Sequence, residues 1–146
     1  NSNLVEIENP VNLDYDVLRP SLIPSVLQIF SENQHHEYPQ KLFEINKVVE
    51  EKEKLSLIIS SCHERANFTE LKQILDVLLK SLELEYALKE TINETFIEGR
   101  VGNIIIKNKN IGVIGEIHPE VLTNFNLSNP VSLIELNLEE LYSVLN

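Results

Sequence analysis

The sequence has 146 residues, of which 42% are hydrophobic and 24% are charged, a balance typical of one globular domain of ordinary size. Twelve basic against 23 acidic residues give a net charge of −11, which argues against a direct grip on nucleic acid, since phosphates are bound mainly by Lys and Arg. A single cysteine excludes an internal disulfide, and no apolar run approaches the roughly 20 residues of a membrane helix. Because no signal-type segment opens the chain either, we expect a cytoplasmic protein without a membrane contact.

The first 32 residues predict a strand and then a helix. Residues 4–8 alternate as a strand does and end at Asn9-Pro10, and the missing initial methionine suggests a piece of a longer polypeptide. Ser21 is a credible N-cap for a helix, and Pro24 is tolerated in its first turn. One apolar face at helical spacing follows, made of Leu22, Ile23, Val26, Leu27, Ile29 and Phe30.

The middle of the chain predicts a hairpin and a second helix. Residues 42–49 and 55–61 are rich in apolar and β-branched residues, and the charged run 50–54 between them indicates a solvated turn. Over residues 69–82 leucine and isoleucine recur at helical spacing, with Asn67 or Thr69 as the cap. Glu70 and Lys80 lie at the ends where the helix dipole favours their charges.

The last third predicts a hairpin, a short helix, a strand and a closing helix. Residues 84–89 lead to strands over 96–106 and 111–118 with a turn at 107–110, and Pro119 precedes a helix over 120–125. A strand over 131–138 and a helix over 139–144 end the chain. The sum is an α+β domain over residues 1–146, with six or seven mostly antiparallel strands and with its helices gathered on one side of the sheet.

The residues alone support no catalytic, cofactor or metal site. Cys62 and His63 are adjacent in a strand and point to opposite faces, and His35-His36 lacks a second pair of ligands. Glu116 and His118 share a strand face and could form an acid/base pair, although capping a helix or bracing a loop fits them better. The sequence contains neither a Walker loop nor a Rossmann fingerprint.

Several segments in order resemble the β subunit of phenylalanyl-tRNA synthetase, in its class II catalytic-like core. They are Asn9-Pro10 with VLRPSLIP (17–24), LFEINKVV (42–49), FIEGR (96–100), GVIGEIHPEVL (112–122) and PVSLIELNLEEL (130–141). HHEYPQKLFEI is closer to the archaeal and eukaryotic version of the family. Together with the ELKQILDVLL helix, these segments cover nearly the whole chain.

The resemblance implies a class II-like fold that no longer catalyses the synthetase reaction. In this family the α subunit forms phenylalanyl-adenylate from ATP and charges tRNA, and the β core is a degenerate copy that packs against α in a heterotetramer. Alignment on the class II pattern puts Glu50 and Glu140 where two phosphate-binding arginines stand, and a carboxylate there repels a triphosphate. It also puts Leu136 and Leu138 in a stretch that is otherwise glycine-rich, where they would fill the nucleotide space.

The resemblance therefore implies a non-catalytic module that scaffolds α. We expect no cofactor on this chain, with ATP and Mg²⁺ bound at α and with tRNA bound only by the holoenzyme. The motif 1 helix that precedes this core in the family is missing from the sequence. The residues expected as structural signatures are Arg19, Pro20, Pro24, Glu44, Gly115, Glu116, His118 and Pro119.

Three further expectations remain open at this point. Arg19 should pair with a carboxylate, either Glu44 or Glu116. An alternative function is a stand-alone enzyme or small-molecule-binding domain that uses Glu44, Glu116 and His118 as the polar groups of the degenerate pocket. A third possibility is an acidic regulatory module of an unrelated assembly.

Overall fold

A computed structural model describes residues 19–145, and they form one open antiparallel sheet with helices packed on it. The six strands of this region run in the order β1-β2-β6-β5-β4-β3. The elements are α3 (Ile23–Glu32), β1 (Gln40–Val49), β2 (Glu53–Cys62), α4 (Phe68–Ser81), β3 (Ala87–Glu90), β4 (Phe96–Ile106), β5 (Lys109–Ile117), α5 (Pro119–Asn124), β6 (Val131–Asn137) and α6 (Leu138–Val144). The predicted α+β fold with a mainly antiparallel sheet is confirmed, and the strand predicted over residues 4–8 lies outside the described residues.

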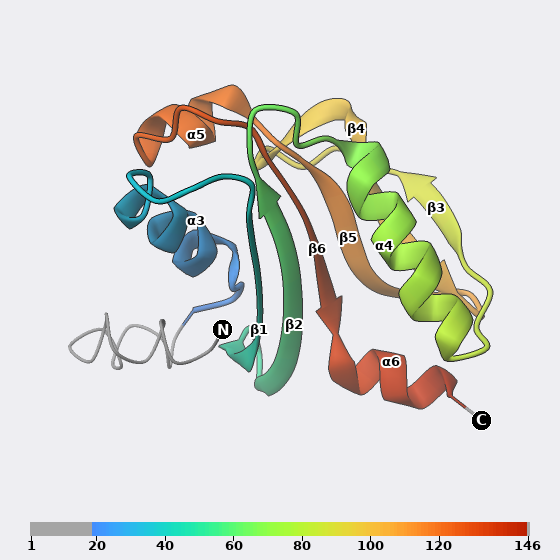
Figure 1. Cartoon of the computed structure of the whole chain (residues 1–146). Helices are drawn as coiled ribbons and strands as arrows, with labels where there is room; N and C mark the ends of the chain where they lie inside the picture. Colours follow the sequence, from blue (N-terminus) through green and yellow to red (C-terminus); the bar gives the residue numbers. More distant parts are fainter. Residues whose placement is uncertain (1–18, 146) are drawn as a thin grey trace.

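Helices cover both faces of the sheet, so the prediction that they gather on one side is wrong. Figure 1 shows α3 and α5 on one side and α4 and α6 on the other. The reason lies in the central strand β6, where Leu133 packs in one core and the adjacent Ile134 packs in the other. Successive side chains of a strand point to opposite faces, so an unbroken apolar run needs a helical layer on each side.

Two hydrophobic cores result, one on each face. The first lies under α3 and includes Val26, Leu27, Phe30, Ile58, Phe96, Ile117 and Leu133. The second lies under α4 and α6 and includes Leu71, Leu75, Leu79, Ile104, Ile114, Ile134, Leu136 and Leu141. The leucine stripe of the predicted 69–82 helix is therefore core, as its spacing indicated.

The helix starts follow capping chemistry with small shifts from the predicted positions. Helix α3 begins at Ile23 with Leu22 as its N-cap, so the prediction of Ser21 as the N-cap is wrong by one residue, although Ser21 Oγ still accepts the Ile23 N–H at 3.0 Å. Pro24 lies in its first turn, where a missing N–H costs little. Asn67 caps α4 by accepting the Glu70 N–H at 2.9 Å. The β4–β5 turn is tighter than predicted, because Lys107 and Asn108 adopt positive φ and the return strand begins at Lys109.

Candidate functional site

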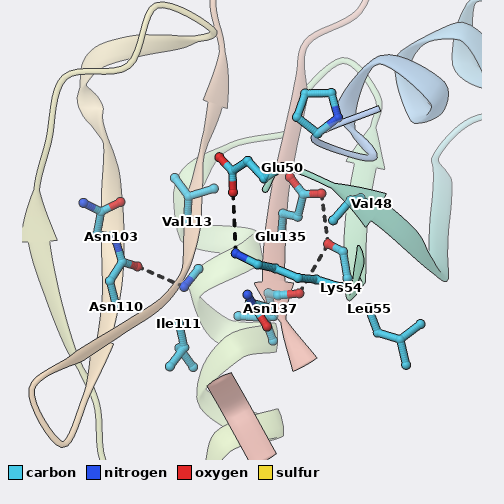
Figure 2. Close-up of a pocket in the computed structure, with 14 residues that line it drawn as sticks. Val48, Glu50, Lys54, Leu55, Asn103, Asn110, Ile111, Val113, Glu135 and Asn137 are labelled. Carbon is cyan, nitrogen blue, oxygen red and sulfur yellow. Dashed lines mark hydrogen bonds and ion pairs between the residues drawn. The ribbon is translucent and has the colours of Figure 1, made fainter. Parts of the chain in front are cut away.

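A polar pocket lies on the α3 face of the sheet, beyond the start of α3. Its volume is about 320 Å³, and strands β1, β2, β4, β5 and β6 all contribute to its walls (Figure 2). The polar residues that line it are Glu50, Lys54, Ser56, Asn103, Asn110, Glu135 and Asn137. We call it the sheet pocket.

The charges of the sheet pocket do not favour an anion. Lys54 is the one cation among the described residues that line it, and its Nζ lies 3.8 Å from Glu50 Oε1. Glu135 adds a second carboxylate, so acids outnumber bases two to one at this surface. A triphosphate needs several aligned cationic or N–H donors, and here the single ammonium already faces a carboxylate.

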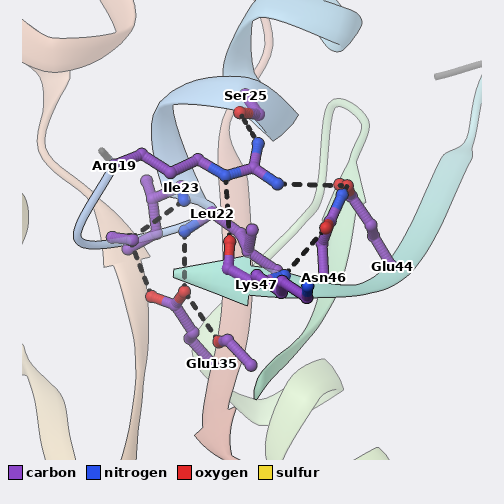
Figure 3. A network of polar contacts seen from close by, with 10 residues as sticks. Arg19, Leu22, Ile23, Ser25, Glu44, Asn46, Lys47 and Glu135 are labelled. Atoms are coloured by element: carbon purple, nitrogen blue, oxygen red, sulfur yellow. Dashed lines mark hydrogen bonds and ion pairs between the residues drawn. The ribbon is translucent and has the colours of Figure 1, made fainter. Parts of the chain in front are cut away.

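Glu135 is held by the fold itself and anchors the start of α3. Its carboxylate accepts hydrogen bonds from Ser21 Oγ and from the Leu22 N–H, both at 2.8 Å, and from Ser56 Oγ at 3.0 Å (Figure 3). Three donors on one carboxylate fix it in place as an acceptor of structural bonds. Sequence reasoning missed this residue, although a lone acid inside the apolar run of β6 is itself a signal, because a buried charge needs partners.

Arg19 ties the start of α3 to strand β1. Its Nη1 donates to Ser25 Oγ at 2.6 Å, its Nε donates to the Lys47 carbonyl at 3.4 Å, and Nη2 lies 3.8 Å from Glu44 Oε2 (Figure 3). Glu44 is only 3% exposed and also accepts a hydrogen bond from Asn46 Nδ2 at 3.0 Å. Of the two carboxylates expected as partners of Arg19, the structure thus places Glu44 beside it.

Glu116 and His118 accept hydrogen bonds from backbone N–H groups at the starts of two different helices. Glu116 accepts the Phe68 N–H at the start of α4 at 2.7 Å and also pairs with Arg100 Nη1 at 3.0 Å. His118 Nδ1 accepts the Glu120 N–H at 3.0 Å and so caps α5. These contacts fit the capping role favoured for both residues.

The polar groups of the alternative function are not assembled into one site. Glu44 lies beside Arg19 next to α3, whereas Glu116 lies at the start of α4 on the opposite face of the sheet. His118 is engaged with the first turn of α5. A pocket that uses Glu44, Glu116 and His118 together is therefore not what the fold builds.

The remaining signature residues have steric or terminal roles. A Cβ on Gly115 would lie 2.7 Å from Phe96 Cδ1, so no larger residue fits there without movement. Pro119 opens α5, and Pro20 lines the sheet pocket.

The two aligned acidic positions lie in different surroundings. Glu50 is in the sheet pocket, whereas Glu140 is in the first turn of α6, with its carboxylate 3.8 Å from Lys109 Nζ. The side chains of Leu136 and Leu138 pack in the second core. Leu136 also lines the sheet pocket, whereas Leu138 does not, and the expectation that the two leucines fill the nucleotide space of a class II site stays a prediction.

The cysteine and histidine pairs show no catalytic arrangement. Cys62 is buried in the first core, and burial raises its pKa to about 11. His63 instead faces α4 and lies 2.9 Å from Glu70 Oε1. Within residues 19–145 no three His, Cys, Asp or Glu side chains converge as metal ligands would. In the same region no helix has the length and apolar content to cross a bilayer.

Comparison with known proteins decides the family. Residues 1–138 match the family model described as the phenylalanyl tRNA synthetase beta chain CLM domain. The chain belongs to this family. Among its curated relatives, the phenylalanine–tRNA ligase beta subunit of Thermococcus onnurineus is 45% identical over 149 residues, covering 97% of this chain and 26% of the relative. Those of Archaeoglobus fulgidus and Methanococcoides burtonii are both 39% identical, covering 94% and 90% of this chain and 25% of each relative.

The chain spans about a quarter of the length of these curated relatives. The family match ends at residue 138, so the sheet, the first core and the sheet pocket lie within the shared domain. The resemblance inferred from the ordered segments is confirmed at the level of the family.

Proposed function

We propose that this chain is a non-catalytic structural module of a phenylalanine–tRNA ligase β subunit. It would scaffold the catalytic α subunit, which forms phenylalanyl-adenylate and charges tRNA. ATP and Mg²⁺ would bind at α and not on this chain, and tRNA would meet only the assembled cytoplasmic enzyme. Family membership and the beta-subunit names of the relatives support this assignment.

The charge of the sheet pocket is the observation that carries the non-catalytic part of the proposal. An ancestral nucleotide site of the class II type needs arginines on the face of an antiparallel sheet, and the described lining here offers only Lys54, which is paired with Glu50, and a second carboxylate on Glu135. Glu135 is fully engaged in anchoring α3. The polar groups on this face therefore serve the fold, which supports a degenerate class II-like module.

A thermal-shift titration tests this proposal. Ligand that binds only the folded state stabilises it by RT ln(1 + [L]/Kd), which is about 2.7 kcal/mol at 100 times Kd. We expect ATP, phenylalanine and a phenylalanyl-adenylate analogue to leave the melting temperature of this chain unchanged, with the α subunit as the positive control. A saturable shift with ATP or the analogue on this chain, abolished by Lys54→Ala, would instead show a working site.

A further inference from the structure

Strand β1 forms one edge of the sheet, and half of that edge has no partner strand among residues 19–145; we call this half the open edge. The Val49 N–H donates to the Arg19 carbonyl at 2.7 Å, and the Lys47 carbonyl accepts from Arg19 Nε, so both residues turn their backbone groups away from β2. Outward and inward pairs alternate along an antiparallel strand, so Phe43 and Ile45 face outward as well. The hydrogen bonds of residues 19–145 leave these two residues without an outward partner.

The side chains at the open edge are also unusual for a solvated strand. Phe43 is 64% exposed and Ile45 is 56% exposed. Phe43 pairs with Ile59, which lines a groove of about 590 Å³ between α4 and the sheet. Ile74, Val77 and Leu78 of α4 form its other wall, and Val77 is 71% exposed. An apolar groove beside unpaired backbone donors is a template for an added strand.

Charge distinguishes between the possible occupants of this edge. Lys41 and Lys47 flank Phe43 and Ile45 on the same face of β1, and both lysines are more than half exposed. Each already lies 3.4 Å from one carboxylate of this chain, Lys41 from Glu70 and Lys47 from Glu53, in exposed pairs that leave ammonium donors toward solvent. A second copy would bring lysines opposite lysines and would join two chains that each carry a net charge of −11. A strand with apolar residues at its centre and carboxylates at its ends would instead pair favourably with this edge.

We propose that the open edge of β1 at Phe43 and Ile45 receives an extended strand of the α subunit, whose apolar side chains lie in the groove beside α4. This inference rests on the proposed function, because α is the partner assigned there. The Arg19 contacts fix where the added strand ends, since the outward groups of Lys47 and Val49 are already engaged. The added strand would therefore pair with residues 41–45 only.

Amide hydrogen exchange, read residue by residue with and without the cognate α chain, tests this inference. The Phe43 and Ile45 amides should exchange at least tenfold more slowly in the complex, while the Val49 amide, already bonded to Arg19, should change little. A complex in which Phe43 and Ile45 exchange as fast as in the free chain would overturn the strand pairing and leave the proposed function standing. Protection of both amides before α is added would also overturn it, because the edge would then be occupied already. Failure to form any complex would overturn both proposals.

A matched pair of variants tests the side-chain part of the contact. Phe43→Thr with Ile45→Thr keeps strand propensity and removes the exposed apolar surface, and we expect it to weaken binding of α at least tenfold. Ile92→Thr is the control, because Ile92 is 80% exposed but lies in the β3–β4 connection, away from the groove. Equal effects of the two changes, or no effect of the double variant, would contradict the assignment.

Discussion

At the residue scale, Gly115 shows how closely β4 and β5 approach where the β4 register shifts. A Cβ there would lie 2.7 Å from Phe96 Cδ1, 2.9 Å from the Arg100 carbonyl oxygen and 3.0 Å from Val101 Cβ. Phe96 is 2% exposed and cannot move freely, so the clash must be absorbed by the core.

Gly115→Ala should therefore destabilise the chain by about 1–3 kcal/mol, the usual cost of overpacking. Gly102→Ala is the matched control in the same strand pair, since its Cβ would meet nothing closer than the Lys89 carbonyl at 3.5 Å. Urea unfolding should show a lower midpoint for Gly115→Ala alone, with the slope unchanged. Equal midpoints for the two variants would show that the β4–β5 contact is looser than described.

Contacts between residues that are near one another in the sequence could be predicted, and contacts between distant residues could not. The capping by His118 follows from its position directly before α5, whereas the sequence left the carboxylate partner of Arg19 open between Glu44 and Glu116. Glu135 was missed because its donors, Ser21 and Leu22, lie more than a hundred residues away. Only the folded sheet brings β6 beneath the start of α3.

At the element scale, one carboxylate from the sheet anchors a helix on each face. Glu135 holds the start of α3 and Glu116 holds the start of α4. In both cases an acid meets the positive end of a helix dipole and satisfies a backbone N–H that has no intrahelical partner.

Glu135→Ala removes three hydrogen bonds at once and leaves the fully buried Leu22 without its acceptor. We expect a loss of about 2–4 kcal/mol in the free energy of unfolding, because unsatisfied buried donors are costly. Glu51→Ala in the exposed β1–β2 turn is the control, with a change within about 0.5 kcal/mol. Denaturant melts of both variants give the comparison, and similar values for the two would show that Glu135 does not anchor α3.

Glu70 predicts a pH dependence for the start of α4. Burial raises the pKa of this carboxyl, but hydrogen bonds from His63 and Ser61 and the nearby Lys41 outweigh burial and hold the pKa below its ordinary value. A lowered folded-state pKa gives stability that is present above the unfolded value of about 4.3 and is lost as pH falls through the folded value.

The difference in unfolding free energy between the native chain and Glu70→Gln should therefore shrink as pH falls from about 6 to about 3. Glu64→Gln removes the same charge from an exposed side chain and serves as the control. Chemical denaturation at several pH values measures both differences. A Glu70→Gln difference of the same size at the two ends of this range would contradict the role given to the carboxylate.

The periodicity of apolar residues predicted the positions of the helices and strands well. It predicted less well which face of the sheet each helix covers. The leucine stripe of α4 and the hairpin of β4 and β5 follow from spacing and turn residues within a few positions. The placement of helices on both faces depends on β6. Its sequence SLIEL is compatible with a strand buried on one face only and also with a strand buried on both faces. In the described sheet β6 lies between β2 and β5, and this interior position agrees with burial on both of its faces.

At the scale of the whole molecule, the two faces of the sheet carry different features. The α3 face holds a small polar pocket whose one described cation is matched by a carboxylate. The α4 face ends in an apolar groove and an open strand edge. An apolar groove with an open strand edge and a pocket poor in positive charge are the two features on which the proposed scaffold function rests.

Sedimentation velocity of this chain mixed with its cognate α chain tests that account most directly. We expect a faster-sedimenting species that contains both chains, and the Phe43→Thr, Ile45→Thr variant should shift the mixture back toward separate chains while Ile92→Thr does not. If the two unaltered chains sediment independently at micromolar concentration, the scaffold function proposed for this chain is contradicted.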